Sequence, residues 1–177
     1  MNIYKANLND LNQIWILRLE TTELLKQRGI DQWQYTDPSL ETFKNDILKG
    51  EFYVAKDENS NIVGMMSVKS GIEHTYDTIF DGKWRVDAPY LTIHRLAVKR
   101  ALLGTKTALE LMKYADELAI VLHTPYIRID THENNKYAIK LFESCGYVYC
   151  GWINLVQKYG DLKRLAFDKE VKHENIL

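Results

Sequence analysis

The sequence is short of cysteine, of net charge and of long apolar runs, and each shortage excludes a class of protein. Its two cysteines, Cys145 and Cys150, form neither a CxxC pair nor a Cys/His zinc spacing, so we expect two buried thiols. A net charge of −1 gives no overall electrostatic footprint for nucleic acid. No apolar run approaches the ~18 residues of a membrane span, and the first residues lack the apolar core of a signal peptide. We therefore expect a soluble, cytoplasmic protein that binds neither nucleic acid nor membrane.

The length and texture of the chain favour one domain. A chain of 177 residues is about the length of a single domain. It shows no internal repeat, low-complexity segment or linker, so we expect a single domain over residues 1–177. Its first half combines antiparallel strands with helices, and strands and helices alternate in its second half. The predicted fold class is therefore α/β, with one mixed, mostly antiparallel sheet and helices on both faces.

The first half carries predicted strands at 2–6, 51–56 and 61–70 and helices at 10–27 and 38–49, followed by an ambiguous segment at 73–88. Apolar residues at helical spacing from Leu11 to Leu25 predict the first helix, and Gly29 ends it. Pro38 suits the first turn of the second helix, which ends at Gly50. The two later strands flank a polar turn, which predicts a β-hairpin.

The second half carries a strand at 91–98, a basic glycine-containing loop, an amphipathic helix from about 104, a strand ending near 132, a further helix and a closing strand to 152. The start of a helix offers free N–H groups and partial positive charge, which suit a pyrophosphate. Arg100 and Lys106 add positive charge beside the start of the helix from about 104, although such residues are also common on solvated surfaces. Asn134 or Asn135 caps the later helix, and Gly146 ends it.

The stretch from His94 to Gly151 resembles the cofactor-binding core of the GCN5-related N-acetyltransferases, the GNAT family. The resemblance rests on the order of strand, basic loop, helix, strand, Asn-started helix and closing Gly-aromatic strand, and it covers nearly the whole chain. It implies the GNAT fold, with strands splayed at the cofactor site. It also implies an N-acetyltransferase that uses acetyl-CoA and acts on a small-molecule or peptide amine by direct attack on the thioester. A homodimer stays open.

The cofactor loop departs from the family pattern of Arg or Gln, two residues, Gly, one residue, then Gly or Ala. Leu103 replaces the usual Arg and Lys106 replaces a usual Gly, whereas Ala108 fits. Backbone N–H groups do not depend on side-chain identity, so phosphates can still bind them. The resemblance implies cofactor contacts from Leu96, Ala97, Val98, Arg100, Leu103, Gly104, Thr105, Lys106, Thr107 and Ala108. A backbone N–H between Leu96 and Val98 would polarise the thioester carbonyl.

The family's last motif adds two positions. Its Asn commonly bonds the pantetheine arm, and this role falls on Asn135, which otherwise serves as a helix cap. A Tyr often follows seven residues later as the acid for the departing thiolate, but Phe142 stands there and has no proton to give. A thiol pKa near ~8.5 makes thiolate a fair leaving group, and water or Tyr137 could protonate it.

The acceptor amine must lose a proton to a base or to water. His94 is a candidate, because it alternates with Leu96 and Val98 on one strand face and has an ordinary pKa near ~6.5, although a packed core histidine is the alternative. Asp130 ends the neighbouring strand and could orient the amine or His132; these two residues are too few for a metal site. Four aromatic residues in irregular segments either wall the acceptor site or cover the core: Trp33, Tyr35, Tyr76 and Trp84.

Two other classes of protein stay open. The departures at Leu103, Lys106 and Phe142 also suit a non-catalytic acyl-CoA-binding module of GNAT fold. A protein-interaction domain that has lost cofactor binding is the second alternative. Fold alone does not decide between them.

Overall fold

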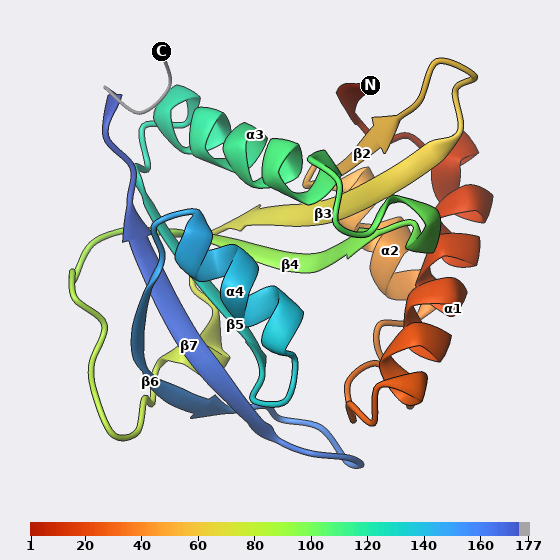
Figure 1. Ribbon diagram of the computed structural model, residues 1–177. Helices are drawn as coiled ribbons and strands as arrows, with labels where there is room; N and C mark the ends of the chain where they lie inside the picture. The colour runs from red at the N-terminus through yellow and green to blue at the C-terminus, as the bar shows by residue number, and fades with distance from the viewer. Residues whose placement is uncertain (174–177) are drawn as a thin grey trace. The chain divides into compact units, whose positions relative to one another are not determined.

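The computed structural model describes residues 1–173 (Figure 1). Its strands are β1 (Asn2–Lys5), β2 (Phe52–Lys56), β3 (Ile62–Ser70), β4 (Leu91–Val98), β5 (Tyr126–His132), β6 (Val148–Asn154) and β7 (Lys163–Glu170). Its helices are α1 (Leu11–Gln27), α2 (Leu40–Leu48), α3 (Thr107–Val121) and α4 (Lys136–Ser144), with 3₁₀ turns η1 (Leu8–Asp10), η2 (His74–Tyr76) and η3 (Arg100–Leu102).

The strands confirm the predicted mixed, mostly antiparallel sheet. Within residues 1–173 they follow the order β1-β2-β3-β4-β5-β7-β6. β4 and β5 pair in parallel, whereas β1 with β2, β2 with β3, β5 with β7 and β6 with β7 pair antiparallel. The chain divides into two compact units: the first comprises Met1–Val68 and His94–Leu111, and the second comprises Lys69–Ile93 and the chain from Met112 onward.

The first unit has helices on both faces of its strands. On one face, α1 and α2 bury a cluster that includes Ile14, Phe43 and Met65, and the Phe43 ring meets the Phe52 ring edge-on at 5.5 Å. Gly64 points to the other face, because neighbouring residues of a strand alternate. A Cβ on Gly64 would lie 2.9 Å from Leu111 Cδ1, so the absence of a side chain lets α3 approach β3 closely.

The second unit buries aromatic rings on both faces of β7. On one face, Phe142 of α4 meets Phe167 at 5.6 Å, and Figure 1 shows α4 lying over β5 and β7. Ala166 faces the other way and belongs to a cluster with Tyr76 and Ile153. Burying large apolar side chains of this kind is worth roughly 1.5–3 kcal/mol each, so both faces contribute to stability.

Three features differ from the sequence expectations. α2 begins at Leu40 rather than 38, because Ser39 is the N-cap and accepts a hydrogen bond from the Thr42 N–H, which leaves Pro38 outside the helix. α3 begins at Thr107 rather than near 104, because η3 occupies the loop before it. Strand β7 was not predicted at all.

Candidate active site

The sequence-predicted site residues fall into both units. The first unit holds Trp33, Tyr35, His94, Leu96, Ala97, Val98, Arg100, Leu103, Gly104, Thr105, Lys106, Thr107 and Ala108. The second holds Tyr76, Trp84, Asp130, Asn135 and Phe142. Within each unit, the structure shows which of these side chains face solvent and which are taken up by the core.

Strand β4 changes conformation at Arg95, directly after His94. Arg95 has a φ of 55°, a left-handed conformation that costs a residue with a Cβ roughly 1–2 kcal/mol. Its guanidinium Nη1 lies 3.3 Å from Oδ2 of the buried Asp46 of α2, which anchors the strained residue. The alternation of His94 with Leu96 and Val98 on one strand face stays a prediction, and the left-handed residue lies between the first two of them. Strain of this kind gathers at functional sites.

The side chains around Arg95 are exposed to different degrees. His94 and Leu96 are half-buried, and Ala97 is buried in the core cluster against α1 and α2. The parallel pairing of β4 with β5 covers Leu91 to Ile93, ahead of His94. The backbone from Leu96 to Val98 thus follows the left-handed residue and lies beyond this pairing.

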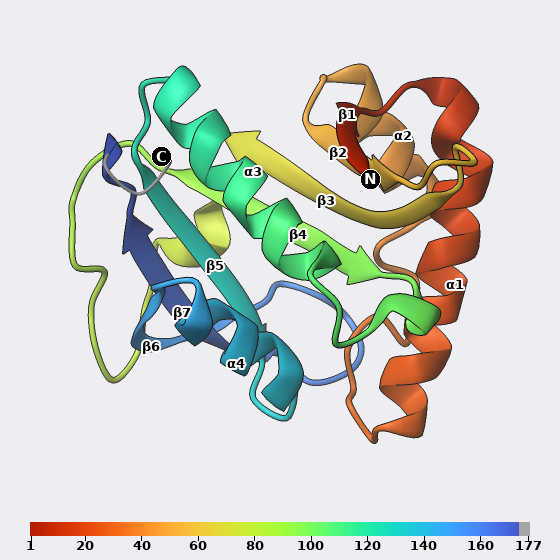
Figure 2. The same ribbon diagram turned by 45° about the horizontal axis from the view of Figure 1, so that its top comes forward.

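The loop after β4 is tied to its surroundings by its first residues. The Lys99 N–H donates to the Val63 carbonyl at 2.8 Å, and the Arg100 N–H donates to Glu20 Oε1 at 2.7 Å. The Arg100 guanidinium donates to Gln27 Oε1 at 3.0 Å, so it contacts α1. Figure 2 shows η3 beside α1. These contacts fix the path by which the chain enters α3.

The segment from Gly104 to Thr107 forms the start of α3. Gly104 has a φ of 78°, and no heavy atom lies within 4 Å of the position that a Cβ would take, so the space beside it is open. The Thr105 hydroxyl donates to the Leu102 carbonyl at 2.6 Å and accepts from the Thr107 N–H at 3.4 Å. The Glu110 N–H donates to the Lys106 carbonyl at 2.9 Å, whereas the N–H groups of Ala108 and Leu109 come before the first such bond that a helix forms. An anion can therefore reach backbone donors here, which fits a pyrophosphate.

Lys106 does not need the conformational freedom of glycine. It is absent from the residues of positive φ within 1–173, so its Cβ causes no backbone strain where the family pattern has Gly. Leu103 is 40% exposed and Lys106 is exposed. The two departures from the family pattern thus change the side chains of the loop but leave a usable backbone.

A hollow of about 530 Å³ lies beside this helix start, lined by Met1, Asp57, Val63, Leu102, Thr105, Lys106, Thr107 and Glu110. Hydrogen bonds from Asn61 lower the pKa of Asp57, so this carboxylate stays charged at neutral pH. Asp57 and Glu110 oppose the charge of Lys106 inside the hollow. A phosphate is therefore better placed at the backbone N–H groups than deep between the two acids.

In the second unit, Asn135 and Phe142 have structural roles in α4. Asn135 Oδ1 accepts from the Ala138 N–H at 3.2 Å and so caps the helix. Phe142 is 3% exposed and contacts the rings of Tyr147 and Phe167, which leaves little of its surface for a cofactor. Tyr137, in the first turn of α4, is 67% exposed.

Asp130 pairs with an aromatic residue rather than with His132. The buried Tyr76 hydroxyl donates to Asp130 Oδ2 at 2.6 Å, and burial, with the Asp130 charge adding to it, raises the pKa of Tyr76 well above its ordinary value. His132 Nε2 lies 2.8 Å from Asp161 Oδ2, and its Nδ1 accepts from the Asn134 N–H at 3.0 Å. Because Nδ1 accepts the Asn134 N–H, Nε2 is the ring nitrogen placed to donate to Asp161.

The four aromatic candidates are not equivalent. Tyr76 is buried, and the Trp84 ring packs on it at 5.0 Å while Trp84 Nε1 donates to the Tyr76 carbonyl, so this pair covers the core of the second unit. Trp33 packs against the core of the first unit and has a φ of 60°. Tyr35 is 52% exposed, a larger exposed fraction than that of the buried Tyr76 or of Trp33, which packs on the core.

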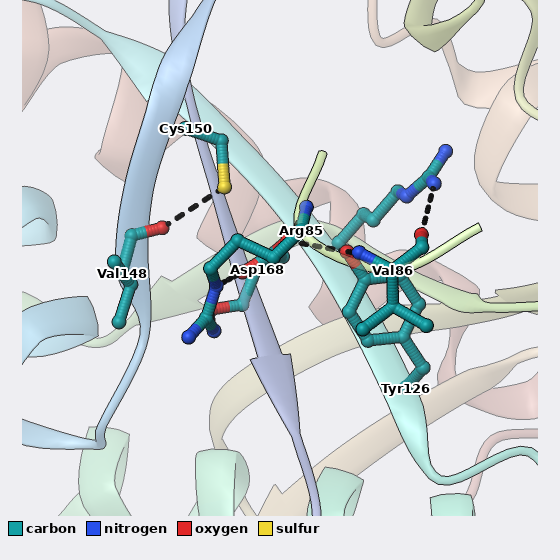
Figure 3. A network of polar contacts seen from close by, with 7 residues as sticks. Arg85, Val86, Tyr126, Val148, Cys150 and Asp168 are labelled. Carbon is teal, nitrogen blue, oxygen red and sulfur yellow. Dashed lines mark hydrogen bonds and ion pairs between the residues drawn. The ribbon is translucent and has the colours of Figure 1, made fainter. Parts of the chain in front are cut away.

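A buried polar network in the second unit was missed by the sequence analysis (Figure 3). Asp168 is fully buried and accepts hydrogen bonds from Tyr126 Oη, from Arg85 Nε and, at 2.9 Å, from the Arg85 N–H. Arg128 donates to the Val86 carbonyl at 3.1 Å. The network holds the segment before β4 against β5 and β7. A charged residue inside the apolar run Ile127–Ile129 was the one available signal.

The two thiols differ in burial: Cys150 is buried as expected, whereas Cys145, at the end of α4, is only half-buried. Burial, with a hydrogen bond to Asp168 adding to it, raises the pKa of Cys150 to about 12, and burial raises the pKa of Cys145. A thiol with a raised pKa is a poor nucleophile at neutral pH, which confirms the expectation of buried thiols rather than reactive ones for Cys150.

Within residues 1–173, no group of three His, Cys, Asp or Glu side chains is placed to hold a metal ion. No helix in this part of the chain has both the length and the apolar character to cross a membrane.

Comparison with known proteins assigns the family. The model of the acetyltransferase (GNAT) family matches residues 14–147. A GNAT-family acetyltransferase from Streptococcus agalactiae is 32% identical, with a TM-score of 0.84 over 97% of this chain and 95% of that chain. No curated protein matches significantly.

Two more distant structures share the fold. Naa20 from Chaetomium thermophilum, in complex with a bisubstrate analogue, is 15% identical, with a TM-score of 0.73 over 99% of this chain and 89% of that chain. PaiA N-acetyltransferase from Thermoplasma acidophilum, in complex with coenzyme A, is 17% identical, with a TM-score of 0.67 over 96% and 98%. The family model and the Streptococcus agalactiae enzyme lead to one conclusion: the chain belongs to the GNAT family and is an acetyltransferase.

Proposed function

We propose that the protein transfers the acetyl group of acetyl-CoA to the amine of a small molecule or peptide, as a single acetyltransferase domain. The observation that carries this proposal is the open space beside Gly104, in the loop that leads into the start of α3. PaiA in complex with coenzyme A and Naa20 with a bisubstrate analogue support the proposal by their shared fold. Bound acetyl-CoA would supply the thioester: the amine nitrogen would bond to its carbonyl carbon, the carbon–sulfur bond would break, and coenzyme A would leave as a thiolate, which a thiol pKa near ~8.5 makes a fair leaving group.

The chain's own residues would bind the cofactor and orient the thioester. N–H groups of the first turn of α3 would hold the pyrophosphate, with Lys106 adding charge. The backbone between Leu96 and Val98, which follows the strained Arg95, would donate an N–H to the thioester oxygen. Because no covalent enzyme intermediate is needed, neither thiol takes part.

We expect that replacing Lys106 with methionine weakens binding of coenzyme A by about 10-fold or more. A charge-assisted hydrogen bond to an anion is worth roughly 1.5–3 kcal/mol, and about 1.4 kcal/mol is tenfold in affinity. Lys113→Met removes an exposed lysine further along α3 and is the matched control. Calorimetry with coenzyme A and with dephospho-coenzyme A measures both variants. Equal losses for Lys106→Met and Lys113→Met would remove Lys106 from the site.

His94 is proposed to take the amine proton, directly or through water. Replacing it with glutamine keeps a polar side chain of similar size but removes the titrating group. With a good acceptor, turnover should fall at least ~10²-fold, the range of general-base contributions, while acetyl-CoA affinity stays constant. The acidic limb of the pH–rate profile should also move. His74→Gln, at an exposed histidine outside the proposed site, is the control. Full turnover with an unchanged profile in His94→Gln would make His94 a packing residue.

One observation favours a second candidate function. Phe142 is buried and cannot donate a proton where family members often carry Tyr. A non-catalytic acyl-CoA-binding module would tolerate that change. Tight acetyl-CoA binding without turnover on any amine would support this alternative.

A further inference from the structure

The loop between α1 and α2 is held by side chains of α1. We call residues 30–38 the acceptor loop, because they carry Trp33 and Tyr35. Arg18 Nε donates to the Pro38 carbonyl at 3.1 Å, and Arg18 Nη2 donates to the Tyr35 carbonyl at 3.2 Å. Arg18 Nη1 donates to the Thr22 hydroxyl at 2.7 Å. One guanidinium therefore links α1 to both ends of the loop's second half.

Thr22 extends this link to the first half of the loop. Its hydroxyl lies 3.2 Å from the Trp33 carbonyl and 3.0 Å from the Arg18 carbonyl, and its one hydrogen is shared between these two acceptors. The Thr22 carbonyl accepts from Gln34 Nε2 at 3.0 Å. Trp33, whose carbonyl is held in this way, has the left-handed φ of 60°. A strained residue persists only where its surroundings hold it in place.

The buried Arg18 guanidinium is stabilised by its hydrogen bonds to the loop carbonyls and by an aromatic ring of α1. Arg18 is 5% exposed, and its guanidinium lies 5.2 Å from the centroid of the Trp15 ring. Burial lowers the pKa of Arg18, and the nearby Asp37 opposes this effect. A planar guanidinium can serve several carbonyl oxygens in fixed directions, whereas a lysine ammonium cannot reproduce this fork. The bonds leave the Tyr35 side chain 52% exposed while its carbonyl is fixed.

We infer that Arg18 and Thr22 are positioning residues, which hold the acceptor loop in the conformation that takes the amine substrate. This inference rests on the proposed function. A loop that is already ordered loses less conformational freedom when the acceptor binds. The bonds from Arg18 and Thr22 should therefore raise the affinity for the acceptor. The cofactor loop does not share these bonds, so binding of acetyl-CoA should not depend on them.

The test replaces Thr22 with valine, which keeps the branched shape and removes the hydroxyl. We expect the KM for the acceptor to rise about 10-fold, kcat to change less, and acetyl-CoA affinity to stay unchanged. Thr22→Ser restores a hydroxyl and should restore the wild-type KM. Thr21→Val is the matched control, because the Thr21 hydroxyl bonds only the Leu17 carbonyl of its own helix among the contacts in residues 1–173. Arg18→Lys should raise the KM as Thr22→Val does. The rate of amide hydrogen exchange in residues 30–38 should rise in both Thr22→Val and Arg18→Lys.

The outcomes separate the inference from the proposed function. Unchanged KM in Thr22→Val, beside an active wild-type protein, would overturn the inference alone. An equal rise in KM in Thr22→Val and Thr21→Val would also overturn it, and so would an equal loss of acetyl-CoA affinity in Thr22→Val. Either result would mean that the substitution weakens the fold in general. If the wild-type protein acetylates no amine, the proposed function falls and the inference falls with it.

Discussion

Replacing Gly104 with aspartate is expected to abolish binding of acetyl-CoA. The new carboxylate would enter the open space beside the start of α3, where the pyrophosphate is proposed to lie. Two like charges ~4 Å apart repel by about 4 kcal/mol near a protein surface, which corresponds to roughly 10³-fold in affinity. Isothermal calorimetry measures the loss directly, and thermal unfolding with saturating acetyl-CoA provides a second measurement.

The control is Gly104→Asn, which has the same size without the charge. Asn and Asp both tolerate the left-handed conformation that Gly104 adopts, so the two variants carry similar backbone strain. Gly104→Asn should therefore retain most of its affinity. Equal affinity in the aspartate variant and the wild-type protein would move the pyrophosphate away from this loop. Equal losses in both variants would point to strain rather than charge.

Replacing Asp168 with asparagine is expected to lower the free energy of unfolding by about 1–3 kcal/mol, the usual cost of leaving buried polar groups without their partners, because the Arg85 side chain is 45% exposed and its charge can still reach water. Asp168 is fully buried, and its oxygens accept from Tyr126 and from two groups of Arg85. The variant leaves the Arg85 charge without its carboxylate and places amide hydrogens against donors. Urea unfolding measures the change. Glu133→Gln, which breaks an exposed pair with Lys163, should cost at most ~1 kcal/mol.

The Asp168 carboxylate should also make the free energy of unfolding depend on pH in acid. Burial acts to raise the pKa of Asp168, but hydrogen bonds from Tyr126 and Arg85 outweigh burial, and the pKa lies below its ordinary value. Its contribution to stability is therefore full above the unfolded-state pKa of ~3.9 and is lost as pH falls through the folded-state pKa. Below about pH 4 the wild-type protein should lose stability more steeply than Asp168→Asn. Parallel curves for the two proteins would exclude Asp168 as a source of the acid dependence.

Periodicity in the sequence predicts most of the elements. The apolar run at 91–98 coincides with β4, and the helical spacing from Leu11 to Leu25 falls in α1. These signals are local, because each depends on which face of one strand or helix is buried. The start of α3 was placed too early, because Gly104 and Thr105 belong to a turn whose hydrogen bonds close back onto Leu102.

Side chains buried through distant partners were harder to predict. β7 was missed because Arg164, Asp168 and Lys169 give it a polar appearance, although all three are buried. The left-handed backbone at Arg95 has no sequence signature, since glycine is the usual sign of that conformation. The burial of Arg18 could have been predicted, because it lies four residues after Ile14, on the apolar stripe of α1. A charged residue on a buried helix face indicates a buried polar partner.

The most direct test of the whole account is to measure the release of free thiol from acetyl-CoA over a broad panel of amines and to identify the acetylated product by mass spectrometry. The account predicts that at least one small-molecule or peptide amine raises thiol release well above the rate without acceptor. It predicts one acetylated amine per thiol released, and loss of both signals in Gly104→Asp. Tight binding of acetyl-CoA with no acetylated amine in the panel would contradict it and favour an acyl-CoA-binding module.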